Sequence, residues 1–333
     1  MPGSDPIYLD HNATTPLLPE VVDAMLPYLR EHFGNPSSGH IYGTRARDAV
    51  ARARAQVAAL LECDDDEVLF TSGGTEANNL AIRGATEARP ERPHVLTTVI
   101  EHPATARPCD WLARHGTRVS RIAVDAHGVA GHGRELGDGL EHAGLVVRVH
   151  HAHERTLAVQ RGAREGEVRD AGAWTHTDAA QSVGKVPVRV RSLGVDLLSI
   201  AGHKLYAPKG VGALYVRRGI AIAPFALGAG HERGLRPGTE NVASIVGLGA
   251  ACELARRDLD KVTTTVCALR DQLHTTLAAE IPGLALNGHR DLRLPNTLNV
   301  RFPGATGGAV LEGAPEIAAS TGSACHEGHE RAS

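Results

Sequence analysis

The sequence predicts an α/β fold, in which a mostly parallel central sheet has helices on both faces and a smaller, incomplete α+β domain follows. Two observations predict it. First, short apolar segments of strand length alternate along the chain with segments of helix length, and parallel strands need such helical crossovers. Second, from about Val242 the alternation is replaced by one long helical segment and a short mixed one, which indicates a second architecture.

The individual elements follow from apolar periodicity. Helices are expected over residues 20–32 and 44–61, where apolar residues recur with helical spacing. The strands expected, in chain order, are 67–71, 94–100, 117–124, 145–149, 173–178, 195–200 and 212–216. A further helix follows the first strand and closes at Gly84, and a last one runs from Val242 to Leu277 before the strand-like residues 297–302.

The expected domain boundary lies near residues 255–265. The large domain is expected to cover residues 15–258, and the small domain to combine residues 1–14 with residues 259–333. A chain of 333 residues is long enough for two such units. Because ligands bind at the carboxyl ends of the strands in sheets of this kind, functional residues are expected at that edge.

Composition limits the possible partners and compartments. A net charge of -3 and a pI near 6.7 make nucleic acid and anionic membranes poor partners and favour a small neutral or zwitterionic substrate. No export signal or spanning segment is recognisable, and the five cysteines contain no C-x-x-C pair. We therefore expect a cytoplasmic protein with reduced thiols. The histidines show no metal spacing beyond a weak H-H-A-H at 150–153, so no metal site is expected.

Lysine is scarce in this chain. Of 35 basic residues only four are lysines, namely Lys185, Lys204, Lys209 and Lys261. Lys204 lies in the small, apolar stretch S-I-A-G-H-K-L-Y, at the end of an expected strand. An amine can lose its proton and a guanidinium cannot, so Lys204 is a candidate for covalent chemistry.

The segment T-S-G-G-T-E, residues 71–76, predicts an anion site. It lies between an expected strand and an expected helix, so the free N–H groups of the helix would face a ligand above the sheet edge, most naturally a phosphate. The alternative is an ordinary turn with Ser72 or Thr75 as the helix cap. The segment is neither a Walker A loop nor G-x-G-x-x-G, so a nucleotide is not indicated.

Asp178 ends another expected strand, and Gln181 follows it. A carboxylate near a phosphate site and a reactive amine suggests pyridoxal phosphate, whose ring nitrogen needs an acidic partner to stay protonated. The alternative is that Asp178 only caps a helix. His102, in I-E-H-P, also follows a strand, where it is placed either to stack on a cofactor ring or to serve a structural role.

Taken together, the motifs resemble the cysteine desulfurases of the class V aminotransferase fold. The stretches that carry the resemblance are Y-L-D-H-N-A-T-T-P, F-G-N-P-S-S, F-T-S-G-G-T-E-A-N-N-L-A-I, I-E-H-P-A, H-T-D-A-A-Q-S-V-G-K-V-P, G-H-K-L-Y-A-P-K-G-V-G-A-L-Y, E-R-G-L-R-P-G-T-E-N-V, L-P-N-T-L-N-V and S-T-G-S-A-C. They occur in order from Tyr8 to about His326, which is nearly the whole chain.

The resemblance implies a fold-type I, homodimeric pyridoxal-phosphate enzyme that takes sulfur from L-cysteine and leaves L-alanine. It implies that Lys204 forms the imine with the cofactor, that His102 stacks on the ring and helps proton transfer, and that Asp178 pairs with the ring nitrogen. Gln181 would reach the ring hydroxyl. The phosphate would be bound by Gly74, Thr75 and His203, and by Thr239 of the other subunit.

Cys325 is the implied sulfur carrier. It lies among small polar residues in S-T-G-S-A-C, where its thiol is reachable, and the resemblance implies that it attacks the substrate sulfur and holds it as a persulfide. The sulfur would then pass to an acceptor protein, such as an iron-sulfur scaffold, or to thio-cofactor synthesis.

Three positions depart from the family's pattern. His153 and Glu154 stand where the family has two asparagines, and Ala201 stands where it commonly has serine. The sequence also ends eight residues after Cys325, whereas the family continues to an arginine that binds the substrate carboxylate, so we expect a C-terminally truncated small domain. The departures leave two alternatives open: an inactive or impaired cofactor-binding homologue, or another class V enzyme such as a selenocysteine lyase or an aminotransferase.

Overall fold

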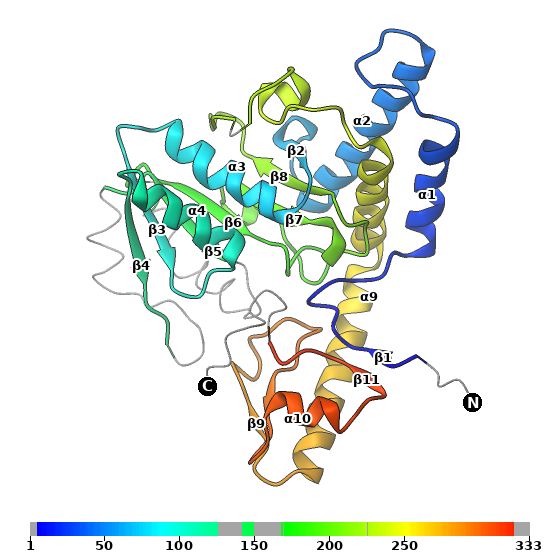
Figure 1. Cartoon of the computed structure of the whole chain (residues 1–333), viewed down its shortest axis with the longest axis vertical. Helices are drawn as coiled ribbons and strands as arrows, with labels where there is room; N and C mark the ends of the chain where they lie inside the picture. Colours follow the sequence, from blue (N-terminus) through cyan, green and yellow to red (C-terminus); the bar gives the residue numbers. More distant parts are fainter. Residues whose placement is uncertain (1–4, 126–141, 150–167, 169, 225, 323–333) are drawn as a thin grey trace.

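A computed structural model describes residues 5–125, 142–149, 168, 170–224 and 226–322 of the chain (Figure 1). Its centre is a seven-stranded sheet. In spatial order the strands are β2 (Val68–Thr71), β8 (Gly212–Val216), β7 (Leu197–Ala201), β6 (Trp174–Asp178), β5 (Leu145–Val149), β3 (His94–Thr98) and β4 (Arg118–Ile122). Neighbouring strands from β7 to β4 are parallel, which confirms the mostly parallel sheet.

Strand β8 is the exception, because it runs antiparallel to both of its neighbours. In the register of the sheet, Gly212 pairs with Thr71 on one side and with Ala201 on the other. A Cβ atom on Gly212 would lie 2.8 Å from the backbone of Gly73 and 2.5 Å from the carbonyl oxygen of Ile200. A glycine is therefore required where the ends of β2 and β7 approach each other.

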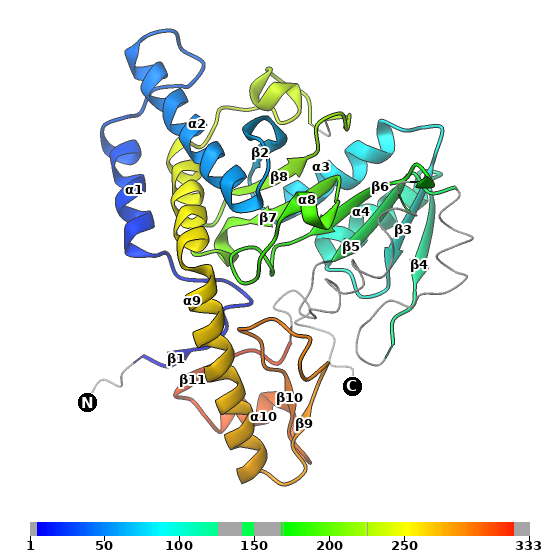
Figure 2. The same ribbon diagram turned by 180° about the vertical axis from the view of Figure 1, so that it is seen from behind.

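Helices cover both faces of the sheet, as predicted (Figures 1 and 2). On one face lie α1 (Pro19–Arg30), α2 (Ile41–Leu61) and the first part of α9 (Val242–Glu280), and on the other lie α3 (Gly74–Glu87) and α4 (Pro103–Arg114). Successive strand residues point to opposite faces. Leu198 thus belongs to the core under α2 and α9, whereas Leu197 belongs to the core under α3.

The predicted ends of the helices lie within a few residues of the observed ones, but the predicted end of α3 is wrong. Helix α3 continues to Glu87 and does not close at Gly84. A Cβ atom on Gly84 would lie 2.5 Å from the carbonyl oxygen of Ala223, so this glycine lets another segment approach the helix. The short helices are η1 (Asp65–Glu67), α8 (Val190–Leu193), η2 (Gly202–Lys204) and η3 (His231–Gly234).

A smaller unit lies beside the second half of α9 (Figure 1). It contains the parallel pair β1 (Ile7–Tyr8) and β11 (Ile317–Ala318), the antiparallel pair β9 (Ala285–Leu286) and β10 (Val300–Arg301), and α10 (Gly307–Glu312). The pairing of β1 with β11 places Ile7 and Tyr8 in this unit. The division into residues 15–258 on the one hand and residues 1–14 and 259–333 on the other stays a prediction. None of the helices in the described ranges combines the length and hydropathy that crossing a membrane requires.

Candidate active site

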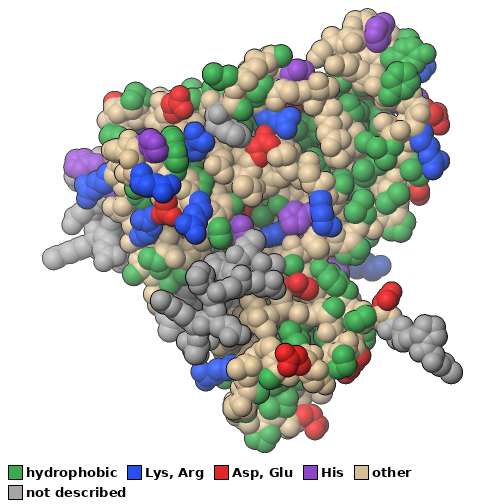
Figure 3. Space-filling model, in the orientation of Figure 1, with side chains coloured by type: hydrophobic (Ala, Val, Ile, Leu, Met, Phe, Trp, Pro, Cys, Tyr) green, Lys and Arg blue, Asp and Glu red, His purple; other side chains and the backbone are tan. Residues whose placement is uncertain are grey.

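The site lies at the edge of the sheet where β2, β7 and β6 end, with the antiparallel β8 between β2 and β7. A cavity of about 430 Å³ opens there. Its lining residues are Ala13, Thr14, Ser72, Gly73, Gly74, Thr75, Glu76, His203, Lys209, Gly210 and Val211. In Figure 3, histidine and basic side chains gather on this face of the molecule, just above the smaller unit.

One wall of the cavity is the N-terminus of α3. Its N-cap is Gly73, which has a φ of 147° and offers no side chain to the first N–H groups of the helix. The alternative of a turn capped by Ser72 or Thr75 is therefore wrong. A Cβ atom on Gly74 would lie 3.1 Å from Cβ of Ala201, so glycine and alanine at these positions allow the helix start to pack on the end of β7. The N–H groups of the first turn can then serve an anion.

The Glu76 carboxylate lies in the cavity wall and has two hydrogen-bond donors, one of which is charged. Its carboxylate accepts hydrogen bonds from Nε of Arg236 (2.9 Å) and from the backbone N–H of Ser72 (2.8 Å). Burial would raise the pKa of Glu76, but these bonds outweigh it and hold the pKa below its usual range. A negative side chain beside the helix start is thus balanced, which keeps the cavity suitable for an anion.

The opposite wall is η2, which carries His203 and Lys204 directly after β7. The carbonyl oxygen of His203 accepts hydrogen bonds from the backbone N–H (2.8 Å) and the hydroxyl (3.0 Å) of Thr15. The His203 ring contacts the Thr14 hydroxyl through Nδ1 at 3.2 Å. Burial, and then the positive charges of Lys204, Lys209 and Lys185, lower the pKa of His203, so a neutral imidazole is favoured.

Asp178 is held by a residue that the sequence analysis missed. Nδ2 of Asn78 in α3 donates to Oδ2 of Asp178 at 2.7 Å, and the backbone N–H of Ala180 donates to Oδ1 at 3.0 Å. Asp178 is 5% exposed and Asn78 1%. Asn78 follows Thr75 by three residues and so lies on the same face of α3. That spacing could have identified Asn78 from the sequence. Asn78 links the Asp178 carboxylate to the helix that forms the cavity wall.

Gln181 is held at both ends of its amide. Nε2 donates to the carbonyl oxygen of Asn12 at 2.9 Å, and Oε1 accepts from Nζ of Lys185 at 2.8 Å. Asn12 in turn donates to the hydroxyl of Thr297 (3.0 Å) and accepts from Nδ2 of Asn296 (3.1 Å). Gln181 is therefore connected to the smaller unit by hydrogen bonds between segments far apart in sequence.

His102 is the N-cap of α4, and its Nδ1 accepts the backbone N–H of Ala104 at 3.1 Å. His102 therefore has a structural role as a helix cap, which was one of the two roles considered for it. The cap makes Nδ1 an acceptor and leaves Nε2 as the nitrogen that can carry a proton. Within the described residues, the cavity wall contains Gly74, Thr75 and His203. Lys204 follows His203 in η2, and Asp178 is bonded to Asn78 of α3, whereas Gln181 and His102 are not among the lining residues.

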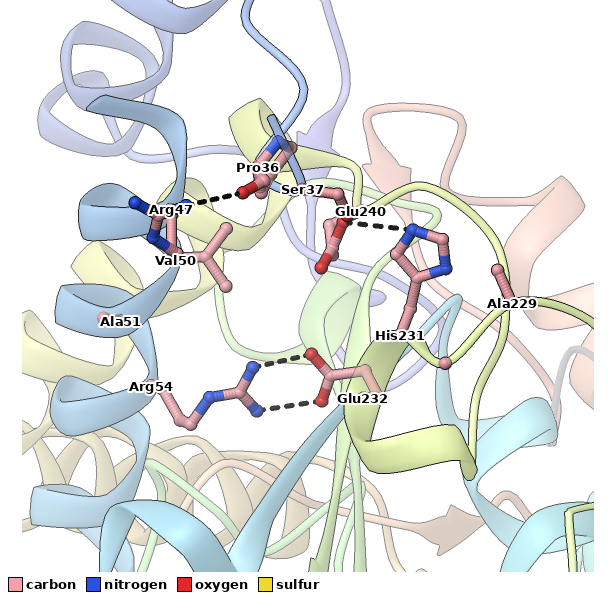
Figure 4. A pocket seen from close by; sticks show the side chains of 11 residues that line it. Pro36, Ser37, Arg47, Val50, Ala51, Arg54, Ala229, His231, Glu232 and Glu240 are labelled. Atoms are coloured by element: carbon pink, nitrogen blue, oxygen red, sulfur yellow. Dashed lines mark hydrogen bonds and ion pairs between the residues drawn. The ribbon is translucent and has the colours of Figure 1, made fainter. Parts of the chain in front are cut away.

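Thr239 is exposed and does not line this cavity. It belongs to the loop that follows η3, and its neighbour Glu240 lines a second cavity of about 520 Å³ (Figure 4). Glu232 anchors that loop by a two-point ion pair with Arg54 (2.6 and 2.8 Å) and by accepting the N–H of Phe70. Glu232 and Arg233 have φ values of 46° and 59°, so the ion pair holds a strained backbone in place.

Several predicted positions lie outside the described residues. They are Cys325, the H-H-A-H segment at 150–153, and Glu154. Ala201, which stands where the family commonly has serine, is buried, and its methyl group faces Gly74.

Comparisons with known proteins identify the class. The family model for class-V aminotransferases matches residues 7–332. A cysteine desulfurase of Trichormus azollae is 46% identical over 325 residues, which are 97% of this chain and 81% of that protein. The cysteine desulfurase NifS of Azotobacter vinelandii is 45% identical, with coverage of 97% and 81%. A solved NifS-like protein superimposes with a TM-score of 0.84 at 33% identity, covering 94% of this chain and 86% of the other. The chain therefore belongs to the class-V aminotransferase family and, within it, to the cysteine desulfurases.

Proposed function

We propose that the protein is a pyridoxal-phosphate-dependent cysteine desulfurase, which converts L-cysteine to L-alanine and moves the sulfur to Cys325. The observation that carries the proposal is the convergence of three groups at one sheet edge: the uncapped start of α3, the amine of Lys204 and the buried carboxylate of Asp178. These are the groups that the phosphate, the aldehyde and the ring nitrogen of this cofactor require.

The site fits the cofactor in two further respects. Oδ1 of Asn78, beside Asp178, is buried and has no hydrogen-bond partner within the described residues, so it can accept a bond from a further donor. His203 and Lys209 bring imidazole and ammonium groups to the cavity in front of α3. When bound, pyridoxal phosphate supplies an electron sink for the substrate's α-carbon.

The residues of this chain would have separate roles in binding the cofactor and in proton transfer. Lys204 would hold the cofactor covalently, and Gly74, Thr75 and His203 would bind its phosphate, with Thr239 of a second subunit. The Asp178 carboxylate would accept a hydrogen bond from the protonated ring nitrogen, and Gln181 would donate one to the ring hydroxyl. His102, with Nδ1 occupied by Ala104, would exchange a proton at Nε2.

Sulfur transfer requires a reactive thiol. The thiolate of Cys325 would form an S–S bond with the substrate sulfur as the C–S bond breaks. The electron pair of that bond stays with the carbon, which takes up a proton and leaves as L-alanine, so Cys325 is left as a persulfide. Burial raises the pKa of both Cys63 and Cys109 to about 12, and it also raises the pKa of Cys252. These three thiols are therefore poor nucleophiles.

The test is a two-part experiment on the purified full chain. With pyridoxal phosphate added, we expect the visible absorption of bound cofactor, lost in Lys204→Ala and kept in the control Lys261→Ala. With L-cysteine and dithiothreitol, we expect sulfide and alanine in equal amounts. Cys325→Ala should release sulfide about 100-fold more slowly, and Cys267→Ala at the rate of the parent.

Each alternative has its own outcome in this experiment. A parent chain that binds no cofactor would contradict the proposal in favour of an inactive homologue. Bound cofactor with turnover of selenocysteine or of an amino donor, and none of L-cysteine, would support another class V activity. A homodimer, a cytoplasmic location and a sulfur-acceptor protein, such as an iron-sulfur scaffold, also belong to the proposal, and sedimentation and persulfide-transfer assays test the first and last of them.

A further inference from the structure

The amide of Gln181 has one orientation that satisfies both of its neighbours. Nζ of Lys185 can donate in either protonation state, and the amide oxygen faces it at 2.8 Å. The carbonyl oxygen of Asn12 only accepts, so the amide nitrogen has to face it, at 2.9 Å. An amide NH2 has two hydrogens, and the contact with Asn12 uses one of them.

Lys185 is an unusual choice for this contact. In the described part of the chain no carboxylate pairs with it, and Nζ donates to the neutral amide of Gln181. Burial, together with the nearby positive charge of Lys204, lowers the pKa of Lys185 to about 7. Burying a cation beside another cation costs stability, so packing alone does not account for the residue.

The backbone around Lys185 is fixed from two sides. Its N–H donates to the carbonyl oxygen of Ser182 at 3.0 Å, and its carbonyl oxygen accepts from the Thr263 hydroxyl of α9 at 2.9 Å. The side chain of Lys185 therefore reaches Gln181 from a backbone that hydrogen bonds hold in position.

We propose that Lys185 is a positioning residue, which fixes the amide of Gln181 so that its NH2 group, and not its oxygen, faces the ring hydroxyl of the cofactor. The inference rests on the proposed function. Without Lys185, Oε1 of Gln181 loses its donor and only the contact with Asn12 orients the amide, so the NH2 group is held less firmly toward the ring hydroxyl. Lys185 thus acts on cofactor binding through Gln181.

A double-mutant cycle in cofactor affinity tests this directly. Apoprotein of the parent, Lys185→Met, Gln181→Ala and the double variant is titrated with pyridoxal phosphate, and Kd is measured by equilibrium dialysis. Lys185→Met should weaken binding about 5- to 10-fold, as the loss of one hydrogen bond predicts. In the Gln181→Ala background the same change should have no effect, whereas independent contributions would multiply.

Two further variants complete the design. Lys261→Met removes a lysine from the exposed part of α9 and should bind the cofactor as the parent does. Lys185→Arg keeps donors opposite Oε1 and should restore most of the affinity. Thermal unfolding of each apoprotein shows whether it is folded. If Lys185→Met is not, Lys185→Gln replaces it, with the same expectation that its effect disappears in Gln181→Ala.

The outcomes separate this inference from the proposed function. A parent that binds no pyridoxal phosphate contradicts the function itself. A parent that binds it, with Lys185→Met binding equally well, overturns the positioning role alone. The role is also overturned if the two single effects multiply in the double variant, because Lys185 then acts independently of Gln181.

Discussion

At the scale of the residue, the buried polar groups near the sheet edge are held by partners from distant segments. Asp178 is held by Asn78 of α3, and Gln181 by Asn12 and Lys185. Asn12 and Gln181 are 169 positions apart in sequence. No local pattern reports such a pair, which is why Asn12 was missed. Asn78 and Lys185 have local spacings, three residues from Thr75 and four from Gln181, which were not used. Asp178, His203 and Lys204 were predictable because each follows an apolar strand.

His176 provides a residue-scale prediction. Its ring is buried, Nε2 contacts the Ser199 hydroxyl at 2.9 Å, and burial lowers its pKa from 6.5 to about 4. Between pH 6.5 and 4 the unfolded chain takes up a proton that the folded chain does not, so stability falls as the pH falls through this window. We expect a loss on the order of 2–3 kcal/mol.

The measurement is urea unfolding of the apoprotein at pH 6.5 and pH 4.5, compared with His176→Gln. The variant has no group titrating at this position, so its stability should change less between the two pH values. An equal change in both proteins would contradict the assignment. His115→Gln, at an exposed position, serves as the control and should behave as the parent does.

At the scale of the element, strand positions were readable from the sequence, but the direction of β8 was not recognised. Its neighbours in the sheet include β7, and only residues 202–211 connect the two strands. Parallel neighbours need a crossover of a dozen or more residues, so this connection is too short for a parallel pair. The spacing was present in the sequence. The short connection was not used to predict the strand direction, because residues 202–211 were considered only as the segment that carries Lys204.

The antiparallel strand leads to an element-scale prediction. Gly212→Ala would put a methyl group 2.5 Å from the carbonyl oxygen of Ile200 and 2.8 Å from the backbone of Gly73. Both contacts are with backbone, which cannot rotate away, so we expect a loss of about 1–3 kcal/mol in the free energy of unfolding. Cofactor affinity should fall as well, because Gly73 starts the cavity wall.

Denaturant unfolding and cofactor titration of Gly212→Ala measure these two effects. The matched control is Gly308→Ala in α10, where a Cβ atom would meet nothing within 4 Å. It should be neutral or slightly stabilising, since alanine favours the helix. Equal stability of the two variants would show that the sheet accommodates the methyl group.

At the scale of the whole molecule, α9 belongs to both parts of the structure (Figure 2). Its buried residues lie between Ala243 and Cys252, against α1, α2 and the sheet. Farther along, Leu269 is 60% exposed, and the helix is tied to the smaller unit mainly by polar contacts, such as Arg270 to the carbonyl oxygen of Leu294 (2.9 Å) and Arg293 to Asp271 (3.0 Å).

This difference in burial predicts that the two halves of α9 differ in their protection against amide hydrogen exchange. Amides of residues 243–252 should exchange with solvent hydrogen about 100-fold more slowly than those of 262–273, because opening the second half exposes little apolar surface. Hydrogen exchange followed by mass spectrometry measures both segments in one sample, with the buried α2 as the slow reference. Uniform protection along α9 would contradict the prediction.

The pairing of β1 with β11 has a consequence for the order in which the chain can fold during synthesis. Ile7 pairs with Ile317 and Tyr8 with Ala318, so β1 cannot find its partner until residues 317 and 318 have been synthesised. Thr14 and Thr15, only a few residues later, bind His203 and can be placed much earlier. The N-terminal segment is therefore expected to dock in two stages: its inner end with the completed sheet, and its outer end only after β11 has been made.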